Sequence, residues 1–185
     1  MFGPKTDGGY YRVHDHLLAG QYPGAWGSQG PKAAVRRLID AGVTFFLDLT
    51  QEGEKGLPSY ASWLQRAGSG AKRAVYYRRM PIPDFETPTV EQMRDILDAL
   101  DAALAEGHTV YVHCYAGLGR TGTVIACSMV RHGRNAESAL QELARLREGT
   151  TLAGVPSPIT EEQRQLVYGW AGFDARAQSR SIAGR

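Results

Sequence analysis

Few features of this sequence place it outside the ordinary globular proteins. Its 185 residues include two cysteines, Cys114 and Cys127, too few for a disulfide framework and without the Cys/His spacing of a zinc site. Lys and Arg number 21 against 19 Asp and Glu, and a net charge of +2 makes neither nucleic acid nor an anionic membrane the expected partner. No apolar run approaches the length of a membrane span, and no apolar segment of a signal peptide opens the chain. We therefore expect a reducing cytoplasm, where a free thiol remains available as a nucleophile.

What the chain does contain is an alternation of strand-like and helix-like segments. Residues 43–49 and 109–113 are apolar runs of strand length, as in buried parallel strands. Residues 89–106 carry apolar side chains at helical spacing and stop at Gly107. Further strands are expected within residues 10–20 and at 74–80. Two further helices are expected before and after the strand at 43–49, one from about residue 28 to Gly42 and a short one that ends near Gly68. Three more are expected after the strand at 109–113: one that ends at Gly133, one over about 135–148 and one over about 160–170. This order predicts an α/β fold with a central, mainly parallel β-sheet flanked by helices.

Length and composition predict one domain. With 43% hydrophobic residues, the chain can build a single core, and two domains would each be small. We expect this domain to occupy residues 1–170 and to be followed by a flexible C-terminal tail, 171–185. We also expect a monomer.

The most informative segment is the turn after the strand at 109–113, which reads HCYAGLGRTG from residue 113. It leads into a helix N-terminus, where free backbone N–H groups and the helix dipole favour an anion. Gly117 and Gly119 let such a loop curl its amides inward, and Arg120 offers a planar pair of donors to phosphate oxygens. Cys114 would lie at the floor, where these donors favour its thiolate. A mononucleotide P-loop is excluded because Arg120 stands where that motif requires lysine.

This segment resembles the signature of the cysteine-dependent protein-tyrosine phosphatases, His-Cys-x-x-Gly-x-Gly-Arg-Thr/Ser-Gly. Residues 80–85 (MPIPDF) look like the general-acid loop of the small atypical dual-specificity phosphatases, and residues 49–54 (LTQEGE) like their loop after an early strand. The resemblance covers roughly residues 10–170, which makes residues 1–170 a phosphatase-like catalytic domain. The chain is too short for a classical tyrosine phosphatase domain and lacks the tyrosine-recognition loop of that group.

The resemblance implies a two-step reaction without metal or cofactor. Cys114 attacks phosphorus and water then cleaves the cysteinyl-phosphate, while Arg120 and the loop amides hold the phosphate oxygens. Thr121 is expected to donate its hydroxyl to the thiolate. The expected phosphate-binding residues are Tyr115, Ala116, Gly117, Leu118, Gly119 and Arg120. Phosphate, vanadate or sulfate should occupy the same loop.

Asp84 is the expected proton donor to the leaving group. It lies in a loop with Pro81, Pro83 and Pro88, which stiffen the backbone. Glu86 is the second candidate, although it would need a different loop pose. Phe85 either forms a wall of the pocket or packs as a core anchor.

Three further residues have expected supporting or structural roles. His113 should face away from the nucleophile and hydrogen-bond the loop. Gln163 could position the hydrolytic water, as in some relatives, but Thr160 precedes it at the spacing of a helix capping box, the interpretation that the sequence favours. Cys127, among apolar neighbours, is expected to be a buried small side chain rather than a redox partner of Cys114.

Together these features predict a protein phosphatase that acts on phosphotyrosine in a phosphoprotein or phosphopeptide, with phosphoserine and phosphothreonine open. Two alternatives remain. The same chemistry could act on a non-protein ester such as an inositol phosphate, a nucleotide or an RNA 5′-phosphate, or the chain could be a phosphate-binding pseudophosphatase. Tyr115 and Leu118 stand where phosphoinositide phosphatases of this superfamily carry lysines, which argues against a highly charged headgroup. The nucleophile, arginine and acid are all present, which argues against a pseudophosphatase.

Overall fold

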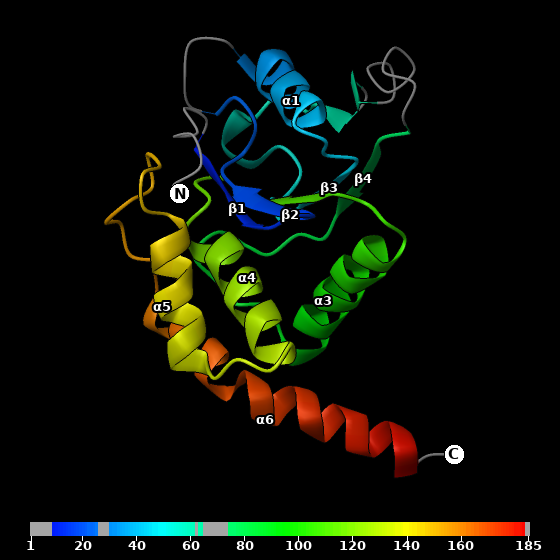
Figure 1. Ribbon diagram of the computed structural model, residues 1–185, viewed down its shortest axis with the longest axis vertical. Coiled ribbons are helices and arrows are strands. Elements are labelled where there is room, and N and C mark those ends of the chain that lie inside the picture. The colour runs from blue at the N-terminus through cyan, green and yellow to red at the C-terminus, as the bar shows by residue number, and fades with distance from the viewer. Residues whose placement is uncertain (1–8, 26–29, 62, 65–73, 184–185) are drawn as a thin grey trace.

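A computed structural model describes residues 9–25, 30–61, 63–64 and 74–183, the last nine of these by their backbone alone. Its five strands form one sheet in the order β1-β2-β5-β3-β4 (Figure 1). Strand β1 pairs antiparallel with β2, and every other pair is parallel. The strands are β1 (Tyr10–His14), β2 (Leu17–Gly20), β3 (Phe45–Asp48), β4 (Tyr76–Arg79) and β5 (Val110–His113). The predicted α/β class with a mainly parallel sheet is therefore confirmed.

Helices cover both faces of this sheet. Helix α1 lies on one face, and α3, α4 and α5 lie on the other, with α6 packed beneath them (Figure 1). The helices are α1 (Gly30–Asp40), α3 (Val90–Ala105), α4 (Gly119–Arg131), α5 (Ala136–Leu146) and α6 (Glu161–Ala183), and a short 3-10 helix, η1, covers Glu54–Gly56. Two apolar clusters result, one between the sheet and α1 and a larger one between the sheet and the other helices. A sheet buried on both faces explains why its central strands are continuous apolar runs.

Strand β5 and helix α4 form the centre of the domain. All four residues of β5 are buried, and β5 is hydrogen-bonded to β2 on one side and β3 on the other. Helix α4 is buried along almost its whole length and contacts α3, α5 and α6. The loop between β5 and α4 is thus attached at both ends to buried elements at the centre of the domain.

The helix after the β4 loop begins where its sequence predicts. Thr89 caps α3 by accepting a hydrogen bond from the Gln92 N–H (3.1 Å), and the Gln92 side chain accepts one from the Thr89 N–H (3.0 Å). This reciprocal capping box satisfies two donors that a helix start leaves unpaired. It also ends the proline-containing loop at a defined residue, which limits where Asp84 can lie.

The C-terminal helix is longer than predicted. The sequence indicated a helix to about residue 170 and a tail beyond it, whereas α6 continues to Ala183. Asp174 is buried and its carboxylate accepts two hydrogen bonds from Arg131, at 3.0 and 3.1 Å. A buried ion pair with another helix therefore extends the packed part of α6 beyond the predicted end.

Two other expectations need comment. The predicted helix ending near Gly68 lies largely outside the described residues. Within the part of the chain that the structure describes, no helix is both long enough and apolar enough to cross a membrane.

Candidate active site

The turn after β5 forms a closed loop around Cys114. Gly117 has a φ of +74°, and a Cβ there would lie 2.4 Å from the carbonyl carbon of Gly20, so only glycine fits this position. The Tyr22 N–H donates to the Tyr115 carbonyl (3.0 Å), which ties the loop to the segment after β2. The loop's shape is thus set by contacts outside the motif as well as by its own glycines.

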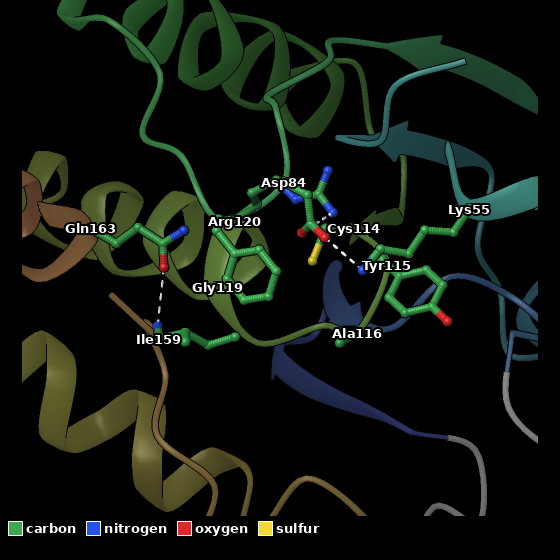
Figure 2. A pocket seen from close by; sticks show the side chains of 10 residues that line it. Lys55, Asp84, Cys114, Tyr115, Ala116, Gly119, Arg120, Ile159 and Gln163 are labelled. Carbon is green, nitrogen blue, oxygen red and sulfur yellow. Dashed lines mark hydrogen bonds and ion pairs between the residues drawn. The ribbon is translucent and has the colours of Figure 1, made fainter. Parts of the chain in front are cut away.

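A cavity of about 250 Å³ opens above this loop (Figure 2). Four segments far apart in the sequence contribute to its walls. The lining residues are Lys55, Asp84, Phe85, Cys114, Tyr115, Ala116, Gly119, Arg120, Ile159 and Gln163. The structure therefore brings together the predicted nucleophile, the predicted arginine and the predicted acid. The β5–α4 loop forms the floor of this cavity.

Arg120 is held in place by a carboxylate behind it. Its two terminal nitrogens donate to the two carboxylate oxygens of Glu54, each at 2.7 Å, and Nη1 also donates to the Ile82 carbonyl (2.9 Å). Both side chains are almost fully buried. Burial alone would lower the pKa of Arg120, but the hydrogen bonds and charge of Glu54 outweigh it and raise that pKa. The guanidinium is therefore a fixed, permanently charged group beside the thiol.

Asp84 reaches into the cavity between two cations. One carboxylate oxygen accepts from Arg120 Nη2 (2.8 Å) and the other lies 2.7 Å from Lys55 Nζ. The Lys55 ammonium also lies 4.3 Å from the centre of the Tyr115 ring (Figure 2). These contacts raise the pKa of Lys55, chiefly through its hydrogen bond with Asp84. The loop that carries Asp84 is therefore closed over the cavity.

The sequence left two alternatives open for the neighbours of Asp84, and the structure shows where both side chains lie. Phe85 is 58% exposed and lines the cavity, so it is a wall and not a core anchor. The Glu86 side chain is exposed and is not among the lining residues. This arrangement favours Asp84 over Glu86 as the group that faces a ligand.

His113 lies behind the loop, as expected. Its ring is fully buried, with Nδ1 3.3 Å from the Cys114 carbonyl oxygen and Nε2 against the Tyr60 hydroxyl. Burial lowers its pKa, which favours a neutral ring. The fully buried Asp48 lies 3.8 Å from His113 and accepts hydrogen bonds from the Thr50 N–H and hydroxyl. These groups support the start of the loop from the sheet side.

Thr121 differs from its expected role. Its hydroxyl donates to the Gly20 carbonyl (3.3 Å) at the end of β2 instead of to Cys114. Position 121 on α4 is fully buried, which brings its hydroxyl against the end of β2. Thr121 thus joins the helix to the sheet.

Two further expectations can be compared with the structure. Gln163 makes the capping-box contacts: its Oε1 accepts from the Thr160 N–H (3.2 Å), and its own N–H donates to the Thr160 hydroxyl (3.2 Å). Cys127 is fully buried, and burial raises the pKa of its thiol. Cys127 is therefore a small core residue, as its apolar neighbours predicted.

Sequence reasoning gave no role to several residues that shape the site. Glu54 was noted only as part of a family-like loop, and Lys55 and Ile159 were not singled out. Ser157, whose hydroxyl donates to the Leu118 carbonyl (2.7 Å), was also missed. For Glu54, the sequence offered one indication. It lies in the loop at residues 49–54, which resembles a loop of the small dual-specificity phosphatases, and its carboxylate can pair with Arg120.

Comparison with known proteins shows the family of this chain. Residues 23–134 match the family described as the DSP-PTPase phosphatase of polymorphic toxin systems, which is more than half of the chain. The chain belongs to this family. Its membership in the cysteine-dependent phosphatases, which the motif at residues 113–122 indicated, is thereby confirmed.

Individual relatives carry related names. A protein of invertebrate iridescent virus 3 named as a tyrosine phosphatase, 067L, is 34% identical over 119 residues, which are 62% of this chain and 42% of the viral protein. The tyrosine-protein phosphatase CDC14 of Candida albicans is 32% identical over 89 residues, 48% of this chain and 16% of the relative. The chain thus spans less than half the length of these relatives.

Solved structures agree on the fold. The crystal structure of Tk-PTP in its active form has a TM-score of 0.67 and 27% identity, and the match covers 89% of this chain and 97% of that one. PTPMT1 in complex with PI(5)P has a TM-score of 0.70 and 24% identity, covering 91% and 99% of the two chains. The second likeness concerns the fold alone.

Proposed function

We propose that this protein is a phosphatase of the dual-specificity type that hydrolyses phosphotyrosine in proteins or peptides through a cysteinyl-phosphate intermediate. One observation carries the proposal. Cys114 and the Arg120 guanidinium, from the β5–α4 loop and the first turn of α4, and the Asp84 carboxylate, from a distant loop, line a single cavity. A nucleophile, a fixed cation and a proton donor are the three groups that this reaction needs.

In the first step the Cys114 thiolate attacks phosphorus, and the bond between phosphorus and the ester oxygen breaks. Asp84, protonated, gives its proton to the leaving oxygen. Arg120 and the amides of the loop bind the other three oxygens, whose charge they balance without a metal ion. The position of Arg120 is already set by Glu54, so little reorganisation is needed when the phosphate arrives.

In the second step water cleaves the phosphorus–sulfur bond. Asp84, now a carboxylate, accepts a proton from this water, and the thiolate and inorganic phosphate are regenerated. The same side chain thus acts as acid and then as base. A reducing compartment such as the cytoplasm suits this cycle, because the nucleophile must stay a thiolate.

The contacts of Asp84 with Arg120 and Lys55 bear on the first step of this reaction. Its carboxylate and a substrate phosphate are both anions that bind Arg120, so we propose that they compete for the guanidinium. A phosphate that takes over Arg120 removes one of the two cations that pair with Asp84, which makes it easier for Asp84 to carry a proton. The site therefore exchanges one anion for another when substrate enters.

The walls of the cavity favour an aromatic ester. Phe85, Tyr115 and Ile159 present apolar surface around the opening, which a phenyl ring covers better than a serine side chain does. Lys55, the one lysine among the lining residues, is already paired with Asp84. These features support phosphotyrosine over a highly charged inositol phosphate.

Hydrolysis assays in chelator across a substrate panel test the proposal. The panel contains phosphotyrosine, phosphoserine and phosphothreonine peptides, inositol phosphates and a 5′-phosphorylated RNA. We expect phosphotyrosine peptides to have the highest kcat/KM. A higher value for an inositol phosphate or RNA would overturn the substrate assignment, and no hydrolysis of any ester, with phosphate still bound, would identify a pseudophosphatase.

A further inference from the structure

The loop that carries Asp84 is held firmly on one side. The Ile82 N–H donates to the Leu49 carbonyl (3.0 Å), and the Ile82 carbonyl accepts from Arg120. Phe85, next after Asp84, has a φ of +63°, a left-handed conformation that is strained for a bulky side chain. The Glu86 N–H donates to the Pro83 carbonyl (3.1 Å), which closes the turn around Phe85, and a further contact holds the loop from its other side.

The contact on that side comes from Gln163. Its Nε2 donates to the Glu86 carbonyl (3.1 Å), across 77 positions of the sequence. Gln163 is fully buried and borders the cavity (Figure 2). The backbone carbonyl that it holds directly follows Phe85, two residues from Asp84.

The other end of the same amide is anchored. Oε1 accepts hydrogen bonds from the Ile159 N–H (3.1 Å) and the Thr160 N–H (3.2 Å) at the start of α6. A Cβ at Gly119 would lie 2.9 Å from this oxygen, so the amide also packs closely on the first turn of α4. The N–H groups of Ile159 and Thr160 occupy Oε1, which is the acceptor that an attacking water would need. The amide is thus oriented with its oxygen toward α6 and its nitrogen toward the acid loop.

We infer that Gln163 is a positioning residue that latches the acid loop closed, so that Asp84 faces the leaving group. The inference rests on the proposed function, since it assigns Gln163 to the protonation step. It acts through the Glu86 carbonyl and does not touch the substrate. The backbone N–H groups of Ile159 and Thr160 therefore have a second purpose, because they fix the amide whose donor holds the loop.

The discriminating variant is Gln163→Glu. Glutamate keeps an acceptor for the two N–H groups of α6 but replaces the donor with an oxygen that the Glu86 carbonyl repels. We expect kcat/KM to fall on the order of 10-fold for aryl phosphates whose leaving group has a pKa near that of tyrosine, about 10, and to change little for strongly activated phenols. The slope of log(kcat/KM) against leaving-group pKa should steepen.

Two control variants test whether the effect of Gln163→Glu comes from loss of the helix cap or from an added negative charge on α6. Thr160→Ala weakens the cap but leaves the Nε2 contact, so it should lower the melting temperature without changing that slope. Gln165→Glu makes the same chemical change on the exposed surface of α6, where Gln165 donates to Glu161, and should leave the slope unchanged.

A different pattern would overturn the inference. If Gln163 orients the hydrolytic water, Gln163→Glu lowers kcat equally for all leaving groups, leaves kcat/KM unchanged and causes a burst of phenol release. If Gln163→Glu changes neither kcat/KM nor its dependence on leaving-group pKa, the position of the acid loop does not depend on Gln163.

A measurement that needs no turnover distinguishes failure of the latch from failure of the proposed function. Amide hydrogen exchange at Phe85 and Glu86 should be faster in Gln163→Glu than in the wild type and unchanged in Gln165→Glu. Faster exchange in a protein that hydrolyses no ester would keep the latch and reject the phosphatase proposal. Equal exchange would reject the latch, whatever the enzyme hydrolyses.

Discussion

The two ends of helix α4 carry the same pair of residue types in different surroundings. Arg120 lies in its first turn, with Cys114 on the loop that leads into it, and Cys127 and Arg131 lie toward its C-terminal end. Both cysteines are buried, and both arginines are held by carboxylates. The partners of Arg120 are Glu54 and Asp84, and those of Arg131 are Asp98, Asp101 and Asp174.

What differs is the space beside them. Cys114 and Arg120 border a cavity at a helix N-terminus, whereas Cys127 is enclosed by the core. Arg131 uses Nε, Nη1 and Nη2 to join α4 to α3 and α6. Neither burial nor ion pairing therefore marks a reactive site in this fold. The decisive feature is a cavity that a ligand can enter, lined by donors that favour an anion.

The largest expected effect is at the two cysteines. Cys114→Ser should lower turnover of a phosphotyrosine peptide by on the order of 10⁴-fold or more while phosphate or vanadate still binds, because a hydroxyl is a poor nucleophile there. Cys127→Ser should keep turnover near the wild-type level. Steady-state assays with isothermal titration of vanadate check this, and substantial activity of Cys114→Ser in chelator would show that the nucleophile is another group.

The two arginines should separate catalysis from stability. Arg120→Lys should lose on the order of 10²-fold or more in kcat, because a point charge does not reproduce the planar pair of donors. Arg131→Lys should instead cost about 1–2 kcal/mol of unfolding free energy with kcat nearly unchanged, because it weakens a partly buried ion pair between helices. Kinetics and urea unfolding of both variants check this; equal kinetic defects would remove the distinction between the two ends of α4.

Asp84→Asn should slow phosphopeptide hydrolysis by about 10²-fold, because asparagine does not give a proton to the leaving oxygen. The loss should shrink as the leaving group becomes more acidic, and the basic limb of the pH–rate profile should flatten. Glu86→Gln is the matched control and should change neither feature, since the Glu86 side chain is exposed. The reverse result would make Glu86 the acid, and no effect of either variant would weaken the phosphoprotein assignment.

Alkylation compares the two thiols directly. Brief iodoacetate treatment should label Cys114 at least 10-fold faster than Cys127, because Cys114 faces a cavity with an adjacent cation while burial raises the pKa of Cys127. Peptide mapping by mass spectrometry measures both sites in one sample, and vanadate should protect Cys114 alone. Faster labelling of Cys127 would mean that its surroundings open more often than the site does.

The smallest expected effect is a pH dependence of stability. Burial lowers the pKa of His113 below its usual value near 6.5, so the unfolded chain binds a proton that the folded protein does not. Stability contributed by neutral His113 is therefore present at pH 7 and is lost as the pH falls below about 6.5. Urea unfolding at several pH values should show a smaller dependence in His113→Gln, and an unchanged slope would mean that His113 does not contribute.

The parts of the fold that the sequence predicted well are those with local causes. The capping box of Thr160 and Gln163 depends on neighbouring residues, and so does the helix that the apolar spacing of residues 89–106 predicts. The end of α6 was misjudged, because what extends its packed part is the contact of Asp174 with Arg131, 43 positions away. The contact of the Thr121 hydroxyl with a carbonyl of β2 was not predicted for a similar reason, since the two residues lie far apart in the sequence.

The sequence by itself determined the chemistry available to this protein. A cysteine and an arginine on one short loop between a buried strand and a helix define an anion site, because strand, loop and helix are contiguous. Tertiary structure alone decided which residues support the site: Glu54 pairs with Arg120, Lys55 pairs with Asp84, and Gln163 donates to the acid loop. These contacts join residues about 29 to 77 positions apart, and spacing along a chain carries no information about such pairs until the sheet and helices have packed.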